Sequence, residues 1–133
     1  MSTAPAVIPV APVLPRPKLV VWFLATLVAV HLLALTAFTP YVFVWWGIPL
    51  VLIGNFIFGS MGINLGYHRM LTHKAATFPT LLERLWVLCG VCSLEGSPLW
   101  WVCVHRIHHQ HSDDSGDPHS PRESFFWGHM QWI

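Results

Sequence analysis

Two long apolar runs fill the first half of the chain. The first extends from Leu19 to about Phe38, and the second, which contains no charged residue, from about Val42 to Leu65. Each has about 20 residues, the length that an α-helix needs to cross the hydrocarbon core of a bilayer. A short turn at residues 39–41 separates them. The pattern predicts a transmembrane helical hairpin, because a segment inside a membrane must satisfy its own backbone hydrogen bonds.

A third apolar stretch, from Leu81 to Val104, is long enough to span but is interrupted by ionisable residues and helix breakers. Glu83, Arg84 and Glu95 lie within it, and a charged side chain at the bilayer centre costs about 2.5–3.5 kcal/mol on insertion scales. Pro98 is expected to break the helix, because proline removes a backbone hydrogen bond and clashes with the preceding turn. We therefore expect interfacial or re-entrant helices over residues 81–104, and an all-α, multi-pass membrane protein.

The flanks of the hairpin predict its orientation. Arg16 and Lys18 precede the first run and Arg69 and Lys74 follow the second, whereas the loop between the runs carries no charge. The positive-inside rule then places both outer flanks in the cytoplasm. Residues 1–17 are rich in proline and alanine and have no charge before Arg16, which excludes the charged start of a signal peptide and indicates a disordered tail.

Composition agrees with a membrane protein. Of the 133 residues 54% are hydrophobic and 10% are charged, and the formal net charge is +1. No basic stripe is present, so we expect no nucleic-acid partner. The three cysteines lie among apolar residues and are odd in number, which indicates buried thiols and not a disulfide framework.

Histidines carry the candidate chemistry. Five of the nine fall in the segment HRIHHQHSDDSGDPH, residues 105–119. On a helix, His105, His108 and His109 share one face because offsets of three and four residues bring side chains together. Imidazole favours transition metals, whereas calcium and magnesium prefer oxygen ligands. The segment therefore predicts a transition-metal site.

A second pair, His68 and His73, lies upstream in the segment NLGYHRMLTH. Five residues of an α-helix rotate a side chain by about 140°, so the pair is not expected to share a face. Five histidines also exceed what one tetrahedral ion uses. We therefore predict two neighbouring ions, and both histidine clusters on one side of the membrane. His111, Asp117 and His119 are candidates for supporting positions that hold the ligands.

These segments resemble a known family. The segments from His68 to His73 and from His105 to His109 are similar to the first two histidine boxes of the membrane-bound fatty acid desaturases, nearest the stearoyl-CoA (delta-9) branch. The NLGY lead-in at residues 64–67, Asp117-Pro-His119 and the aromatic run at residues 125–127 match too. The resemblance covers about residues 59–133.

The resemblance implies a non-haem diiron enzyme that uses O2 to form a cis double bond in a fatty acyl chain. It implies His68, His73, His105, His108 and His109 as iron ligands. It also implies an electron donor such as ferredoxin, rubredoxin or cytochrome b5. Residues 18–133 would then be the N-terminal part of a desaturase domain.

Two departures from the family pattern affect what we expect. A third histidine box is absent from the 133 residues, so we expect the chain alone to bind iron poorly and to lack activity. Residues 102–104, before the second box, are apolar where acyl-CoA desaturases tend to have charged groups. The acyl carrier therefore stays open between CoA, carrier protein and membrane lipid.

Alternatives remain at this point. A related histidine-box hydroxylase or ketolase would use the same iron and O2 but insert oxygen. A haem-binding helix pair or a metal transporter would need histidines or other polar ligands within the spans. Only His31 is so placed, which disfavours both. A non-functional fragment with relic boxes is the last alternative.

Overall fold

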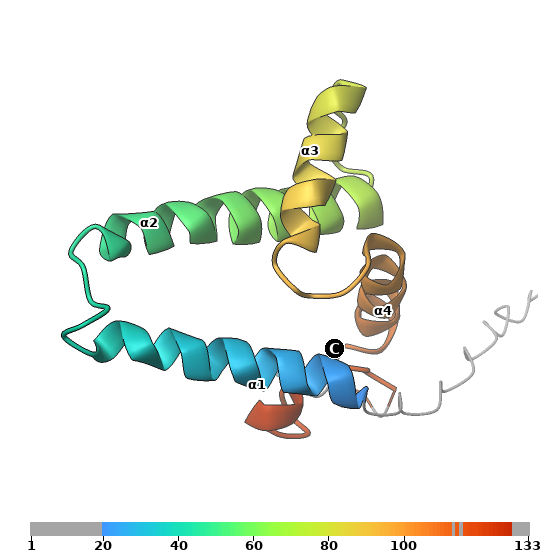
Figure 1. The fold of residues 1–133 in the computed structure, drawn as a ribbon. Helices are drawn as coiled ribbons and strands as arrows, with labels where there is room; N and C mark the ends of the chain where they lie inside the picture. Colours follow the sequence, from blue (N-terminus) through green and yellow to red (C-terminus); the bar gives the residue numbers. More distant parts are fainter. Residues whose placement is uncertain (1–19, 113, 115, 129–133) are drawn as a thin grey trace, which may run out of the picture.

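The computed structural model describes residues 20–112, 114 and 116–128. The tail predicted at residues 1–17 lies outside them. The described residues form helices and turns, with no strand among them. Figure 1 shows the order in space: the chain reverses direction between α1 (Val21–Leu35) and α2 (Gly47–Gly54). The helices α3 (Thr80–Val91) and α4 (Pro98–His111) gather at the far end of the long helix that begins with α2.

The first apolar run forms α1 (Val21–Leu35), which the 3₁₀ turn η1 (Thr36–Phe38) extends. Together they make an 18-residue helix that is long and apolar enough to cross a membrane. None of its residues is buried, and it packs against no other helix in the described part of the chain. The predicted span from Leu19 to Phe38 agrees with this helix to within two residues.

The second apolar run forms one long helix, α2 (Gly47–Gly54) continued by the π-helix η2 (Asn55–Thr72). Its 26 residues are also long and apolar enough to cross a membrane. The predicted boundaries at Val42 and Leu65 were wrong. Residues 42–46 lie in the connection that closes the hairpin, and the helix continues past the apolar run because its backbone hydrogen bonding continues through the polar residues of the first histidine box, His68 to His73.

The third apolar stretch is two helices, α3 (Thr80–Val91) and α4 (Pro98–His111), joined by a turn at residues 92–97. Neither is long enough to span. Pro98 occupies the first turn of α4, where a missing N–H costs nothing, so it begins a helix and does not interrupt one. The Ser97 hydroxyl accepts a hydrogen bond from the Trp100 backbone N–H at 3.3 Å and caps this start.

Glycines let α3 cross η2 in close contact. A Cβ atom at Gly62 would lie 2.5 Å from the Gly90 nitrogen, and one at Gly90 would lie 2.5 Å from the ring of Tyr67. Tyr67 is completely buried there and packs with Ile63, Trp101 and Val102 in the main core. This core joins η2 to α4 directly beside the two histidine boxes.

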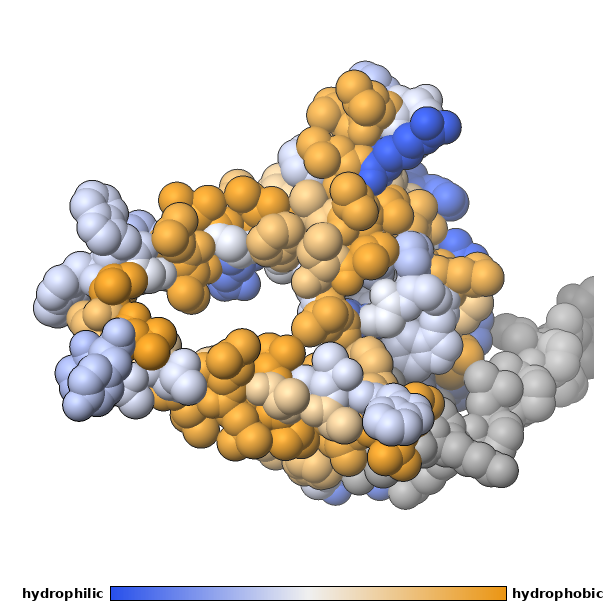
Figure 2. All heavy atoms as spheres, in the orientation of Figure 1, coloured by the Kyte–Doolittle hydropathy of each residue, from blue (hydrophilic) through white to orange (hydrophobic). Residues whose placement is uncertain are grey.

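Along the two long helices the exposed surface is largely apolar. Figure 2 shows hydrophobic side chains along both long helices and a hollow between them. Near the hairpin end, the hollow has a volume of about 310 Å³ and is lined by apolar residues that include Phe38, Val44 and Leu52.

Of the cysteines, Cys89 is buried while Cys92 and Cys103 are exposed, so the expectation of three buried thiols was wrong for two of them.

The close crossing yields a stability prediction. Gly62→Ala should lower the free energy of unfolding by about 1–3 kcal/mol, because the methyl group overlaps the α3 backbone and the helices must separate. Unfolding in mixed detergent micelles, followed by circular dichroism, measures this.

The matched control is Gly54→Ala, whose nearest neighbour would lie 4.0 Å away. It should be neutral or stabilising, because alanine is the better helix former by about 1 kcal/mol. Equal effects of the two substitutions would contradict the close approach.

Candidate metal centre

The end of η2 brings the histidines of the first box together. In a π-helix the hydrogen bonds run between residues five apart, so residues i and i+5 stack on successive turns. The His73 backbone N–H donates to the His68 carbonyl oxygen at 3.1 Å, and the two Nε2 atoms lie 3.0 Å apart. The prediction that His68 and His73 point to different faces was wrong, because it assumed an α-helical turn.

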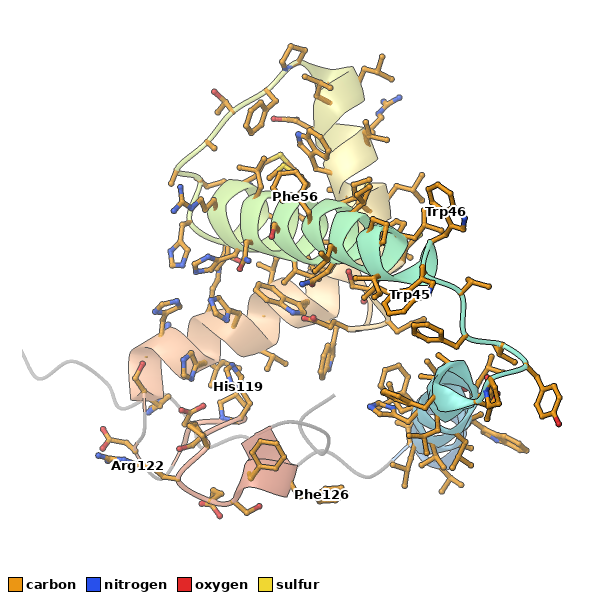
Figure 3. All side chains as sticks on the ribbon, turned by 90° about the vertical axis from the view of Figure 1, so that its left-hand side faces the viewer. Trp45, Trp46, Phe56, His119, Arg122 and Phe126 are labelled. Carbon is orange, nitrogen blue, oxygen red and sulfur yellow. The ribbon has the colours of Figure 1, made fainter. Side chains whose placement is uncertain are left out.

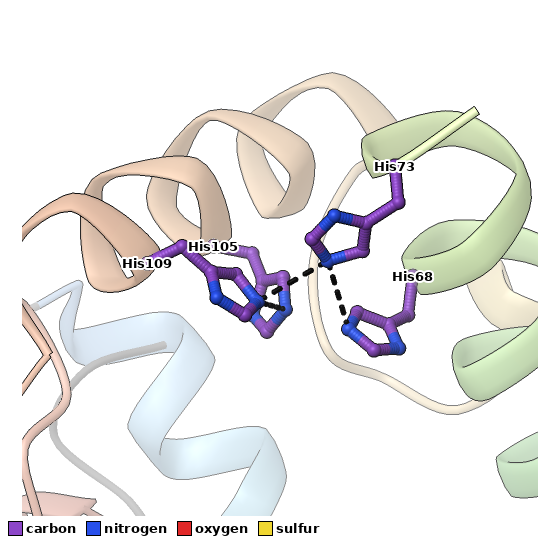
Figure 4. A group of neighbouring side chains, drawn as sticks. All are labelled: His68, His73, His105 and His109. Carbon is purple, nitrogen blue, oxygen red and sulfur yellow. Dashed lines mark hydrogen bonds between the residues drawn. The ribbon is translucent and has the colours of Figure 1, made fainter. Parts of the chain in front are cut away.

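The second box supplies two more imidazoles to the same point. His105 and His109 lie one turn apart on α4, and their Nε2 atoms are 3.0 Å apart. His109 Nε2 also lies 3.2 Å from His73 Nε2, as the dashed lines in Figure 4 show. We call His68, His73, His105 and His109 the four-histidine group; one ligand atom from each lies within 4.8 Å of the others.

This spacing fits a metal ion. A tetrahedral ion with nitrogen ligands at about 2.0–2.1 Å holds those nitrogens about 3.3–3.4 Å apart. The neighbouring Nε2 atoms in the four-histidine group, at 3.0–3.2 Å, would need to separate by only a few tenths of an ångström. The remaining pairs of ligand atoms lie within 4.8 Å, so the group could close around a single ion by side-chain adjustment.

The charge state suits metal binding as well. Burial, followed by the neighbouring His68, His109, His108 and His119, lowers the pKa of His105 from 6.5 to about 3. Burial lowers the pKa of His109 and of His119 in the same direction. Neutral imidazole is the form that ligates metals, so these rings need to release no proton near neutral pH.

A second group lies beside the first and consists of His108, Asp117 and His119; the His108 ring centroid is 5.7 Å from that of His105 and 5.6 Å from that of His109. His108 Nδ1 donates to both carboxylate oxygens of Asp117, each at 2.9 Å. The carboxylate is buried and also accepts the His119 backbone N–H at 3.0 Å. The His119 ring stacks on His108 with centroids 4.1 Å apart. Because Asp117 occupies Nδ1, the Nε2 atom of His108 is the one left for an ion.

The structure thus divides the predicted residues. Four of the five predicted ligands converge in the four-histidine group, and His108 joins Asp117 and His119 instead. His111 belongs to neither group among the described residues; it lies beside Gly116, where a Cβ atom would be 3.1 Å from His111 Nδ1. Figure 3 shows His119 beside α4, apart from Trp45 and Trp46 at the hairpin connection.

Residues that the sequence reasoning missed support the site. Arg106 Nη2 donates to the carbonyl oxygens of Leu71 and Thr72 at 3.3 and 3.2 Å. It thereby ties α4 to the last carbonyls of η2, which have no partner within the helix. Trp101 stacks on His105 with ring centroids 4.5 Å apart. The offset of four residues between Trp101 and His105 on a helix was the available signal.

Known proteins resemble the chain over most of its length. It is 44% identical over 103 residues to the sn-1 stearoyl-lipid 9-desaturase of Anabaena variabilis, covering 77% of this chain and 38% of that protein. It is 41% identical over 109 residues to the chloroplastic palmitoyl-monogalactosyldiacylglycerol delta-7 desaturase of Arabidopsis thaliana, covering 82% of this chain and 29% of the relative. The chain belongs to the fatty acyl desaturase family.

The names of these two relatives specify lipid-linked acyl chains, whereas the name of another relative specifies an acyl-CoA. The icosanoyl-CoA 5-desaturase of Limnanthes douglasii is 41% identical over 110 residues, covering 81% of this chain and 30% of that protein. The chain therefore spans roughly a third of the length of the curated desaturases it matches. No family model and no solved structure matches it.

The buried Asp117 yields a prediction for this desaturase-family site. Asp117→Asn should mix the two neutral tautomers of His108, because a neutral amide no longer fixes the proton on Nδ1 with two carboxylate oxygens. It should also weaken metal binding about 10- to 100-fold, the usual effect of losing such a partner. Nitrogen-15 NMR of labelled histidine reports the tautomer, and Co²⁺ titration reports the affinity.

Asp114→Asn is the matched control, because Asp114 is exposed and belongs to neither histidine group. It should leave the tautomer and the Kd unchanged. A single Nδ1–H tautomer of His108 in the Asp117→Asn protein would contradict the role of the carboxylate.

Proposed function

We propose that this chain carries the metal-binding part of an O2-dependent fatty acyl desaturase that introduces a cis double bond into an acyl chain. The observation that carries the proposal is the convergence of four Nε2 atoms, from both histidine boxes, at spacings suited to one ion. The relatives, all named desaturases, supply the reaction.

The proposed metal is a pair of non-haem iron ions. His68, His73, His105 and His109 would hold one ion, and His108, through Nε2, would contribute to the second. Asp117 and His119 would keep the His108 ring in place. Bound iron supplies O2 activation, which an unactivated methylene requires because it offers no acidic proton to a general base.

The fold offers a place for the acyl chain. A groove of about 470 Å³ runs between the end of η2 and α3, with Met70, Leu71, Val87 and Val91 among its lining residues. Met70 and Leu71 lie between His68 and His73 in the chain, so the groove adjoins the first box. We propose this groove as part of the acyl site, because most of its exposed lining is apolar and suits a hydrocarbon chain. The acyl carrier and the electron donor, ferredoxin, rubredoxin or cytochrome b5, are left open.

We propose that both long helices cross the membrane and that the histidine boxes lie on its cytoplasmic side. The basic residues Arg69 and Lys74 at the end of η2 support this orientation, as do Trp45 and Trp46, each 77% exposed, at the other end. The non-spanning α3 and α4 keep the two boxes on the same side.

The orientation has a direct test in a protein whose native cysteines are replaced by serine. Tyr41→Cys should react with a membrane-impermeant thiol reagent added to intact cells, and Lys74→Cys should react only after the membrane is permeabilised. The reverse labelling pattern would place the boxes outside the cytoplasm and overturn the proposal.

The activity is tested with the complete open reading frame that contains this chain, expressed in a host that lacks the desaturase. Acyl chains lighter by two hydrogens, with a cis double bond, should appear in the lipid fraction. His68→Ala or His109→Ala should lower product at least about 100-fold, because outer partners alone are worth 10- to 100-fold in metal affinity. Gas chromatography with mass spectrometry measures this.

His31→Ala is the control for these substitutions. His31 Nδ1 lies 2.7 Å from the Leu27 carbonyl oxygen on α1, away from both histidine groups, so activity should persist. The 133-residue chain expressed alone should bind iron weakly and give no product. Hydroxylated or keto products would instead identify an oxygen-inserting enzyme, and iron-loaded protein without any oxidised product would overturn the proposal.

A further inference from the structure

The turn between α3 and α4 has an unusual backbone around Glu95. Leu94 has φ of 62° and Gly96 has φ of 90°, so left-handed conformations lie on both sides of this residue. Leucine adopts such a conformation only when the surroundings impose it. Gly96 cannot be replaced without strain, since a Cβ atom there would also lie 2.9 Å from the Trp100 ring. The turn therefore fixes the direction of the Glu95 side chain.

Glu95 points inward and meets Trp101. The Trp101 indole Nε1–H donates to Glu95 Oε2 at 3.0 Å, and Trp101 is only 5% exposed. Burial raises the pKa of Glu95. A half-buried carboxyl group costs free energy unless its interactions offset that cost. An apolar side chain at position 95 would avoid the cost but would leave the buried indole N–H without an acceptor.

Trp101 in turn contacts the four-histidine group. Its ring lies against His105 with an interplanar angle of 24° and approaches His68 edge-on at 6.5 Å. Tyr67 packs against the opposite part of the indole at 5.7 Å. One indole therefore touches histidines from both boxes, and its rotation would release the ring of His105.

We propose that Glu95 is a positioning residue for the metal centre: its carboxylate locks the Trp101 indole, and the indole holds the His105 ring in its ligating orientation. The proposal rests on the proposed metal site of the four-histidine group. A glutamate ten residues before His105 thus acts on an ion that it does not touch.

A purely structural role for Glu95 would have a different signature. If the carboxylate only stabilised the turn, its loss would lower stability without changing the His105 ring environment or the metal affinity relative to stability. Glu95→Gln separates charge from hydrogen bonding, because the amide oxygen can still accept the indole N–H.

The test uses the full chain in lipid nanodiscs with Glu95→Leu, Glu95→Gln and Trp101→Phe variants. The first readout is metal-free: NMR of labelled histidine measures the ring-current shift that Trp101 imposes on His105. Glu95→Leu should remove at least half of this shift, and Glu95→Gln should retain it. The second readout is the Kd for Co²⁺, which should rise about tenfold in Glu95→Leu, the lower end of such effects, and stay within about twofold in Glu95→Gln.

Glu83→Leu on α3 is the matched control and should leave the ring shift and the Kd unchanged, because Glu83 contacts the Phe78 backbone and not the site. Should Glu95→Leu fail to fold by circular dichroism, Trp101→Phe tests the same link, since it keeps a ring but removes the N–H. Trp101→Phe should raise the Kd for Co²⁺ about as much as Glu95→Leu does. The double variant Trp101→Phe/Glu95→Gln should have the same Kd as Trp101→Phe alone.

The outcomes separate the two proposals. If Glu95→Leu leaves both the His105 ring shift and the Kd for Co²⁺ unchanged, the role of Glu95 is overturned while the metal site stands. Wild-type chain that binds no Co²⁺, yet loses the ring shift in Glu95→Leu, would overturn the metal site while the link through Trp101 stands.

Discussion

Four imidazole nitrogens gathered within a few ångströms are the arrangement on which the rest of the structure depends. Each adjacent pair of Nε2 atoms is 3.0–3.2 Å apart, so protonation of these rings would place like charges at contact distance. Burial lowers the pKa of His68, His105 and His109 and so favours their neutral, ligating form. The helices η2 and α4 must therefore meet at a fixed distance and rotation, and the hydrogen bonds from Arg106 to the end of η2 serve that requirement.

The sequence contained enough information for the helical class and for the division of residues 81–104. The two apolar runs predicted both long helices, and the ionisable residues Glu83, Arg84 and Glu95 indicated that residues 81–104 do not form one continuous spanning helix. The boundaries of the second helix could not be obtained in this way. Hydropathy reports which side chains favour lipid, whereas a helix ends where its backbone hydrogen bonds end, and those continue through polar residues to Thr72.

The site shows a similar division. The box residues were recognisable because helical offsets of four bring His105 and His109 together. The division of the ligands between two groups was not recognisable, because it depends on a loop that returns Asp117 and His119 to the face of His108. Trp101 and Glu95 were also missed, since a tryptophan and a turn glutamate in an apolar stretch read as core and interface until their contacts are known.

The wide turn of η2 limits which insertions and deletions the sequence can accept during evolution. Where the hydrogen bonds run between residues five apart, His68 and His73 meet because four residues separate them, while in α4 three residues separate His105 and His109. Loss or gain of a single residue in either box would rotate one imidazole out of the group, whereas many substitutions between them would not. The spacing of the histidines therefore differs between the two boxes because the helices differ. We expect the number of residues between the histidines to tolerate less change than the identities of those residues.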